Sequence, residues 1–188
     1  FDLEMDVLPL IMDMKRTGVR VDLERAELIK KDLISKEKKL LKQIEQDSGV
    51  KDIQIWAARS LAKVFDALKL SYLRTPTGQP SFTKAFLENH THPVAAMIRE
   101  VRELNKSHST FIDSILKHEY KGRIHAEIRQ LKGESGGTVT GRLSMSNPNL
   151  QQVPARNKRI GPLIRSLFLP EEGERWCSAD FSQQEPRI

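Results

Sequence analysis

The sequence predicts an α+β fold that is mostly helical, in which long antiparallel helices precede a small antiparallel sheet. Three observations lead to this prediction. Apolar residues recur at helical spacing through the first two-thirds of the chain. The spacing changes to strict alternation near residue 124, which is typical of a strand. A polar loop rich in glycine, proline and amides follows, between residues 133 and 154.

Two helices are predicted at the N-terminus. The first ends near Gly18 and has one apolar face, made of Leu3, Val7, Leu10, Ile11 and Met14. Residues 19–22 then turn the chain, and Asp22 can cap a second helix that runs to about Asp47 and ends at Ser48 and Gly49. A helix of that length indicates an antiparallel partner rather than an isolated rod.

The next elements are shorter. A helix with Leu61, Val64 and Phe65 on one face precedes a turn-rich connector at 75–81. Ser81 can cap a segment that reaches about Asn89. A second long helix is predicted from Pro93 to about Glu119, because proline suits the first helical turn and the apolar period persists. The two long helices can pack along each other.

The elements after residue 120 form an α+β part. Ile124, Ala126 and Ile128 alternate with polar residues and predict a strand. A short helix is expected around Pro162, and the sequence RWCSAD predicts a strand that ends at Asp180. We therefore expect a helical part at residues 1–120 and an α+β part at residues 121–188.

Composition argues against a disulfide-stabilised protein and against a membrane-spanning protein. The single cysteine, Cys177, excludes a disulfide within the chain and is expected to be a small buried apolar residue. No apolar run approaches the length of a membrane span, and no N-terminal signal is recognisable. These features predict a cytoplasmic protein in a reducing compartment, with no membrane partner.

Basic charge is concentrated in one segment. Residues 121–165 contain nine Lys and Arg and two acids, which gives +7, whereas the whole chain has a net charge of +6. Such a segment favours a polyanion as partner, and nucleic acid in particular. The alternative is a surface that is merely soluble.

Asp180 is the first candidate for chemistry. A carboxylate that follows an apolar strand and precedes a helix start is a common metal ligand. Ser182 and Glu185 have the spacing of a capping box. Spacing alone nevertheless favours a structural role, in which Asp180 ends a strand and Glu185 caps a helix.

The loop TVTGRLSMSNPNLQQVP, residues 138–154, is the second candidate. Its amides and hydroxyls can donate to the minor-groove acceptors that all base pairs share, and Arg142 adds a charged donor. Such a loop can follow a duplex without reading its sequence. A loop whose Asn and Pro residues only make turns fits the composition equally well.

The loop, IRSLFLPEEG and CSADFSQQEPRI together resemble the DNA polymerases of family A, whose usual motifs are TxTGRLSSxxPNLQNIP and DYSQIELR. Three earlier segments are similar in the same order: VLPLIMDMKRTGVRVD, RELNKSHSTFID and GRIHAEI. The resemblance covers nearly the whole chain. It implies a thumb with its lead-in at residues 1–120 and the first part of the palm at residues 121–188.

The resemblance also implies roles for single residues. Asp180 would be the first of two metal-binding aspartates, the carbonyl of Phe181 would touch a metal, and Glu185 would crowd a ribose 2′-OH and so select deoxynucleotides. The primer-template DNA would be contacted by Arg142, Asn149, Gln151, Gln152 and Arg156, and by Asn105, Lys106, Ser109, Ser81 and Lys84 of the thumb. The complete enzyme would use deoxynucleoside triphosphates and two Mg²⁺ ions.

The second aspartate and the nucleotide-binding helix of the family lie beyond the matched motifs, so we expect a fragment of a longer polymerase that is inactive alone. Gln184 and Pro186 replace apolar residues of the usual motif, and Phe181 replaces the common Tyr. These departures favour a phage-encoded or otherwise divergent branch in the bacterial cytosol. Two alternatives stay open: a non-catalytic DNA-binding module derived from such a polymerase, and an interaction protein whose long helices bind another protein.

Overall fold

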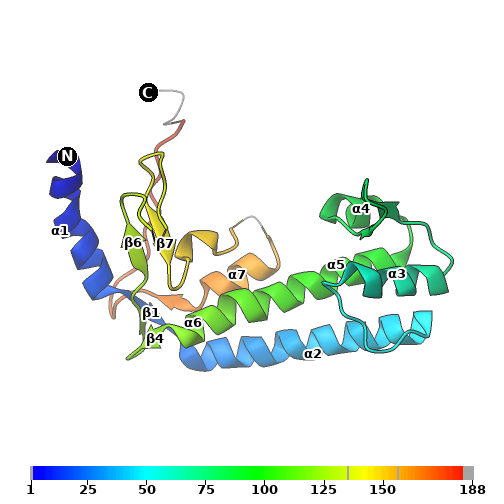
Figure 1. Cartoon of the computed structure of the whole chain (residues 1–188). Coiled ribbons are helices and arrows are strands. Elements are labelled where there is room, and N and C mark those ends of the chain that lie inside the picture. Colours follow the sequence, from blue (N-terminus) through cyan, green and yellow to red (C-terminus); the bar gives the residue numbers. More distant parts are fainter. Residues whose placement is uncertain (1, 135, 156, 184–188) are drawn as a thin grey trace.

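Figure 1 shows the computed structural model of the chain, which describes residues 2–134, 136–155 and 157–183. Its fold is α+β and mostly helical, as predicted. Two long helices lie side by side and run antiparallel, with a small sheet at one end and a cluster of short helices at the other (Figure 1).

Helix α1, Asp2–Thr17, ends as predicted at Gly18, which has a φ of 63° and donates its N–H to the carbonyl of Met14 at 2.9 Å. Its predicted apolar face is not a core face. Ile11 is buried, but Leu3 and Leu10 are 72% and 60% exposed. The helix projects from the body beside strand β6, Glu127–Arg129 (Figure 1), so most of its apolar side chains face solvent.

Residues 19–21 are strand β1, Val19–Val21, and not the turn that the sequence suggested. This strand is central in an antiparallel sheet of order β4-β5-β1-β8. The other strands are β4 (Glu119–Tyr120), β5 (Arg123–Ile124) and β8 (Phe168–Leu169). Val19 pairs with Ile124, and Arg20 pairs with both Arg123 and Leu169. The strands that pair with β1 therefore lie more than a hundred residues away in the sequence, beyond the range of local sequence patterns.

Helix α2, Leu23–Ser48, has the predicted caps. Asp22 accepts from the N–H of Arg25 at 2.9 Å, and Gly49 ends the helix with a φ of 72°. Its partner begins as α5, Pro93–Lys106, passes through a π-helical segment, Ser107–Ile112, and ends as α6, Asp113–Lys117. The predicted second long helix is thus confirmed, with a register shift in its middle.

The far end of the helix pair carries α3 (Ala58–Ala67), the hairpin of β2 (Leu73–Arg74) and β3 (Pro80–Ser81), and α4 (Lys84–Asn89). Ser81 does not cap α4. It pairs with Leu73 in the hairpin, and the cap is Thr83, whose hydroxyl accepts from the N–H of Phe86. An aromatic core forms here, in which the ring of Phe65 lies 4.9 Å from that of Phe82.

A second core joins the two long helices to the sheet and to helix α7, Ile160–Arg165. The predicted strand at 124–128 is divided. Ile124 belongs to the four-stranded sheet, whereas β6 (Glu127–Arg129) pairs with β7 (Ser144–Ser146) in a separate hairpin. A short 3₁₀ helix, Leu150–Gln152, lies within the loop at residues 138–154.

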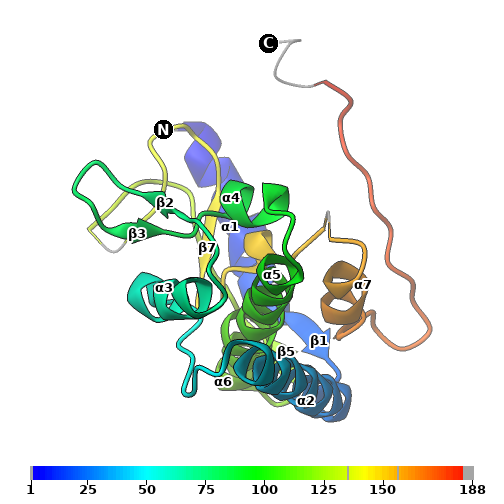
Figure 2. The same cartoon turned by 90° about the vertical axis from the view of Figure 1, so that its right-hand side faces the viewer.

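The predicted strand that ends at Asp180 is wrong for the described residues. Residues 175–181 have no regular secondary structure, and Figure 2 shows this segment running away from the body. A strand needs a neighbour for its backbone hydrogen bonds, and within the described residues this segment has none. Trp176 and Phe181 are accordingly 62% and 80% exposed. None of the described helices is long and apolar enough to cross a membrane.

Candidate nucleic-acid interface

A groove of about 840 Å³ lies where α4, α5 and residues 152–160 meet. Lys84, Lys106 and Gln152, three of the residues predicted to bind DNA, line it together. They come from three separate parts of the chain. The groove also holds two further cations and two carboxylates, namely Arg99, Arg102, Glu88 and Glu103. With four basic and two acidic side chains, it suits an anionic ligand.

Arg102 is built into the wall of the groove. Its Nε donates to the carbonyl of Ile55 and its Nη1 to the carbonyl of Phe82, both at 2.8 Å. Burial lowers the pKa of Arg102. Because both carbonyls belong to other elements, Arg102 ties the segment before α3 and the β2–β3 hairpin to α5.

A chain of polar contacts crosses the seam between α2 and the π-helical segment. His108 Nε2 lies 2.5 Å from Glu37 Oε2, and both side chains are only 12% exposed. The other oxygen of Glu37 accepts from Asn105 Nδ2 at 3.0 Å. Asn105 in turn accepts from the indole Nε1 of Trp56 at 2.8 Å. The Asn105 amide, predicted to hold a phosphate, therefore has a donor and an acceptor engaged within the chain.

The remaining predicted residues of the helical part lie in different surroundings. Ser109 is exposed, and its hydroxyl donates to the carbonyl of Asn105 at 2.7 Å. Ser81 is half-buried in its hairpin. Lys84 is 83% exposed, with its Nζ 3.7 Å from Glu88. Of these three, Lys84 reaches the groove.

The loop at residues 138–154 is folded back on itself. Gln151 Nε2 donates to the carbonyl of Leu143 at 2.9 Å, and its Oε1 accepts from the N–H of Met145 at 3.2 Å. Asn149 caps the 3₁₀ helix by accepting from the N–H of Gln151. Two of the predicted amides thus shape the loop. Arg142 and Gln152 are exposed at its surface.

The base of this loop is a charged hairpin. Arg129 donates to Glu127 at 2.5 Å and to the hydroxyl of Ser146 at 2.7 Å. A hydrogen bond from Asn147 and the charges of Arg129 and Lys15 lower the pKa of Glu127, against a smaller opposing effect of desolvation. The Glu127 carboxylate therefore joins β6, β7 and the first residue of the following turn.

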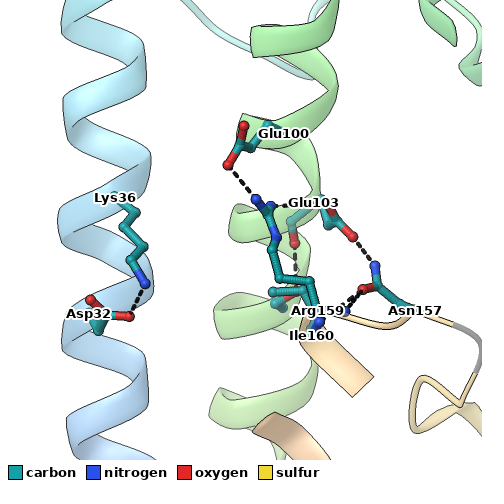
Figure 3. Close-up of polar contacts among 8 residues, drawn as sticks. Asp32, Lys36, Glu100, Glu103, Asn157, Arg159 and Ile160 are labelled. Atoms are coloured by element: carbon teal, nitrogen blue, oxygen red, sulfur yellow. Dashed lines mark hydrogen bonds and ion pairs between the residues drawn. The ribbon is translucent and has the colours of Figure 1, made fainter. Parts of the chain in front are cut away.

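A clamp holds residues 157–160 against α5 (Figure 3). Arg159 contacts Glu100 at 2.5 Å and Glu103 at 3.2 Å. Asn157 donates to Glu103 as well, and its side-chain oxygen accepts from the N–H groups of Arg159 and Ile160. Figure 3 shows Arg159 pointing toward Glu100 and Glu103 of α5, and Asn157 pointing toward Glu103. The clamp fixes one wall of the groove.

The residues expected to hold metal lie in the exposed C-terminal segment. Asp180 and Phe181 are both exposed. Among the residues that the structure describes, no group of three or more His, Cys, Asp or Glu could hold a metal ion. Cys177 is exposed rather than buried as predicted, because residues 175–181 form no regular secondary structure and run away from the body. Glu185 and Arg156 lie outside the described residues.

Sequence reasoning missed three residues of the groove: Trp56, Arg99 and Arg102. A signal was present for each. Arg99, Arg102 and Lys106 follow one another at spacings of three and four, which places them on one helix face. Trp56 is a large aromatic residue in a short segment between helices. Its hydrogen bond with Asn105 helps to place it in the groove, and sequence spacing does not reveal this contact.

The charge excess of residues 121–165 is partly balanced from outside the segment. Arg123 donates to both carboxylate oxygens of Glu171 at 2.7 Å. Arg159 is engaged by the two glutamates of α5. Some of these cations therefore hold the fold, and the charge available to a partner is smaller than the sequence sum.

Comparisons with known proteins agree on one family. The sequence pattern of DNA polymerase family A matches residues 23–188. A DNA-directed DNA polymerase of Pseudomonas phage M6 is 36% identical over 197 residues, which cover 100% of this chain and 30% of that protein. A DNA polymerase DpoZ of Vibrio phage phiVC8 is 36% identical over 98% of this chain and 31% of that protein. DNA polymerase I of Chloroflexus aurantiacus is 33% identical, over 100% of this chain and 20% of its own length.

A solved structure is similar in fold. It is the POL domain of Pol1 from M. smegmatis in complex with DNA primer-template and dNTP, with a TM-score of 0.76 and 28% sequence identity. The match covers 90% of this chain and 30% of that chain. The chain thus spans about a third or less of the length of these relatives. Since the family pattern matches far more than half of the sequence, the chain belongs to DNA polymerase family A.

Proposed function

We propose that this chain is the thumb and the first part of the palm of a template-directed DNA polymerase, and that it binds the primer-template duplex along its basic groove. Residues 1–120 correspond to the thumb with its lead-in, and residues 121–188 to the first part of the palm, in this proposal. The observation that carries it is the meeting of Lys84, Lys106 and Gln152 in one groove, in a chain that matches the family over residues 23–188.

The geometry supports sequence-independent binding. Cations around the groove can neutralise phosphates, which supplies affinity without reading bases. Arg142 and Gln152 are exposed on the loop that follows β6, where their N–H groups can reach minor-groove acceptors. Asn149 and Gln151 act in this proposal by holding that loop in shape, with Gln151 keeping a second amide hydrogen for DNA.

The donor types at Asp180 and Phe181 fit Mg²⁺, because a carboxylate and a backbone carbonyl are hard oxygen ligands. A single carboxylate does not hold two ions, so these residues supply only part of such a centre. When bound, the ions would activate the attacking primer 3′-OH and neutralise the leaving pyrophosphate. Asp180 would hold its carboxylate toward the ions, and Glu185 would exclude a ribose 2′-OH.

For the whole protein we propose a DNA-directed DNA polymerase that uses deoxynucleoside triphosphates in the bacterial cytoplasm and is encoded by a phage. The identities of 36% with two phage polymerases support this origin. Because Asp180 supplies only one of the two aspartates that a two-ion centre of this family would need, we expect the 188-residue chain alone to incorporate no nucleotides. Incorporation of nucleotides by this chain in the presence of Mg²⁺ would contradict the proposal that it holds only part of the active site.

Binding of the chain to a labelled primer-template duplex across a salt series tests the proposal. We expect a steep linear fall of log affinity with log salt, with a slope of roughly −0.9 per neutralised phosphate. Arg142→Ala should weaken binding and change the slope by no more than about one contact. Arg16→Ala is the matched control, because Arg16 is an 83% exposed cation on α1. Weak binding with a flat slope would refute the proposal.

A further inference from the structure

Trp56 is an exposed aromatic residue that the structure holds in a fixed orientation. Trp56 is 59% exposed, although Ile53 and Ile55, which precede it in the same short segment, are buried. A tryptophan that served only the core would bury its rings, because they supply most of its stabilising area. Trp56 instead lines the basic groove with Lys84 and Lys106.

Two contacts fix the ring. Its Nε1–H donates to Asn105 Oδ1 at 2.8 Å, and the guanidinium of Arg102 lies 5.3 Å from the ring centroid. Arg102 is itself fixed by two backbone carbonyls. Because the ring is already ordered before a ligand arrives, little side-chain entropy is lost when something packs on it.

Asn105 is fixed from behind. Its amide donates to Glu37, whose second oxygen lies 2.5 Å from His108. Asn105 lies two residues before the π-helical segment, and His108 lies within it. The wider π-helical turn changes which side chains face α2, and such turns are frequent at functional sites. The whole chain of contacts from His108 ends at one exposed group, the indole of Trp56.

We propose that Trp56 is a DNA-contact residue, whose ring packs against the deoxyribose of one strand of the duplex while the groove cations bind the flanking phosphates. Asn105 is a positioning residue in this proposal. It acts on DNA through Trp56 and does not hold a phosphate itself. The inference rests on the proposed function, since it requires that the duplex follow this groove.

The chemistry of the groove favours a nucleic acid strand over other anions. A sugar-phosphate strand alternates an apolar ring with a charge, and the groove offers an aromatic face among cations. Glu103 is paired with Arg159, which does not line the groove, so its charge is compensated from outside. Glu88 lies within 4.0 Å of both Lys84 and Arg99 and offsets part of their charge. The four cations of the groove still outnumber its two carboxylates.

The test uses the two tryptophans of the chain, Trp56 and Trp176. In a Trp176→Phe variant, emission reports Trp56 alone, and the anisotropy of a labelled primer-template duplex reports binding independently. We expect saturable quenching of Trp56 in step with binding. The converse variant, Trp56→Phe, leaves Trp176 as the reporter and should show no change in step with binding.

Affinity measurements separate contact from positioning. Trp56→Ala should weaken duplex binding roughly tenfold, the scale of one aromatic contact, with an unchanged circular dichroism spectrum. Asn105→Ala should weaken binding less and lower the emission anisotropy of Trp56 in the free chain. The double variant should bind no more weakly than Trp56→Ala alone, since Asn105 acts through the ring. Additive losses would overturn the positioning role.

The outcomes distinguish this inference from the proposed function. If the labelled duplex binds with a steep salt dependence while Trp56 emission stays constant, the proposed function survives and the contact by Trp56 is refuted. If no duplex binds, both fail. Quenching by a single strand but not by the duplex would also overturn the inference, because the ring would then stack on an unpaired base.

Discussion

Replacement of Gly18 by alanine tests the junction between α1 and the sheet. Gly18 has a φ of 63°, a conformation that costs an L-residue about 1–2 kcal/mol. Part of this cost is offset, because alanine lowers the entropy of the unfolded chain by about 0.4–1 kcal/mol. The conformational part of the effect is therefore about 1 kcal/mol.

A second cost comes from space. A Cβ at Gly18 would lie 2.7 Å from the carbonyl oxygen of Ile124 and 2.7 Å from Nδ1 of His125. The imidazole can rotate away, but the carbonyl belongs to β5, which pairs with β1 immediately after Gly18. Overpacking of this kind costs about 1–3 kcal/mol. We expect Gly18→Ala to lower the free energy of unfolding by about 2–4 kcal/mol in total.

Gly49→Ala is the matched control. Gly49 has a similar φ of 72°, yet nothing lies within 4 Å of a Cβ built there. Its loss should be only the conformational part, about 1 kcal/mol. Thermal unfolding followed by circular dichroism measures both variants, and for a chain of this size each kcal/mol lowers Tm by about 2–4 °C. Equal losses in the two variants would refute the steric argument.

Two further predictions concern the polar ties of the groove and loop. Arg159→Ala should destabilise the chain by about 1 kcal/mol, because its two ion pairs are half-exposed and link distant segments. Lys36→Ala is the control: it removes an exposed ion pair within one helix and should cost less than about 0.5 kcal/mol. Urea unfolding measures both variants, and equal losses would contradict the clamp. Glu127→Gln tests pH dependence. The pKa of Glu127 is lowered chiefly by its hydrogen bond with Asn147, so the stabilisation is present above the ordinary value of 4.5 and is lost as the pH falls through the lower folded-state pKa. The variant should therefore be less stable than the parent chain at neutral pH and equally stable at strongly acidic pH. Thermal unfolding at both pH values measures the difference.

The long helices could be predicted because their signals are local. Asp22 caps α2 and Gly49 ends it, as the sequence indicates, and Pro93 begins α5. The apolar stripes of both helices are buried where they meet, at Leu33 and Ile98 among others. Each of these features depends on residues within a few positions of one another, which is the range that periodicity and capping rules cover.

The sheet and the C-terminal segment could not be predicted in the same way. Val19–Val21 is a strand because Ile124 and Phe168 supply partners from distant positions. Residues 175–180 have an equally strand-like pattern but no partner among the described residues, so they form none. A β pattern states only that a segment suits a sheet, and pairing decides whether it joins one.

Sequence motifs could name candidate residues of the site, but they could not show which of those side chains already make hydrogen bonds within the chain. The resemblance to family A polymerases implied DNA contacts for Lys84 and Lys106, and the structure places both in one groove. The same resemblance assigned Asn105, Asn149 and Gln151 to DNA, and the side chains of these three residues make hydrogen bonds within the chain. Residue type shows that an amide can bind a nucleic acid, whereas its partners show whether it is already occupied.

The groove walls are held together by apolar as well as polar contacts. Arg159 and Asn157 tie residues 157–160 to α5. Ile160 of the same segment shares a buried core with Leu104 of α5 and Ile112 of the π-helical segment. Burial of a large apolar side chain stabilises by about 1.5–3 kcal/mol, whereas an exposed ion pair contributes about 0–1 kcal/mol. Loss of the Arg159 ion pairs should therefore loosen this wall without detaching it, which is why the predicted loss for Arg159→Ala is only about 1 kcal/mol.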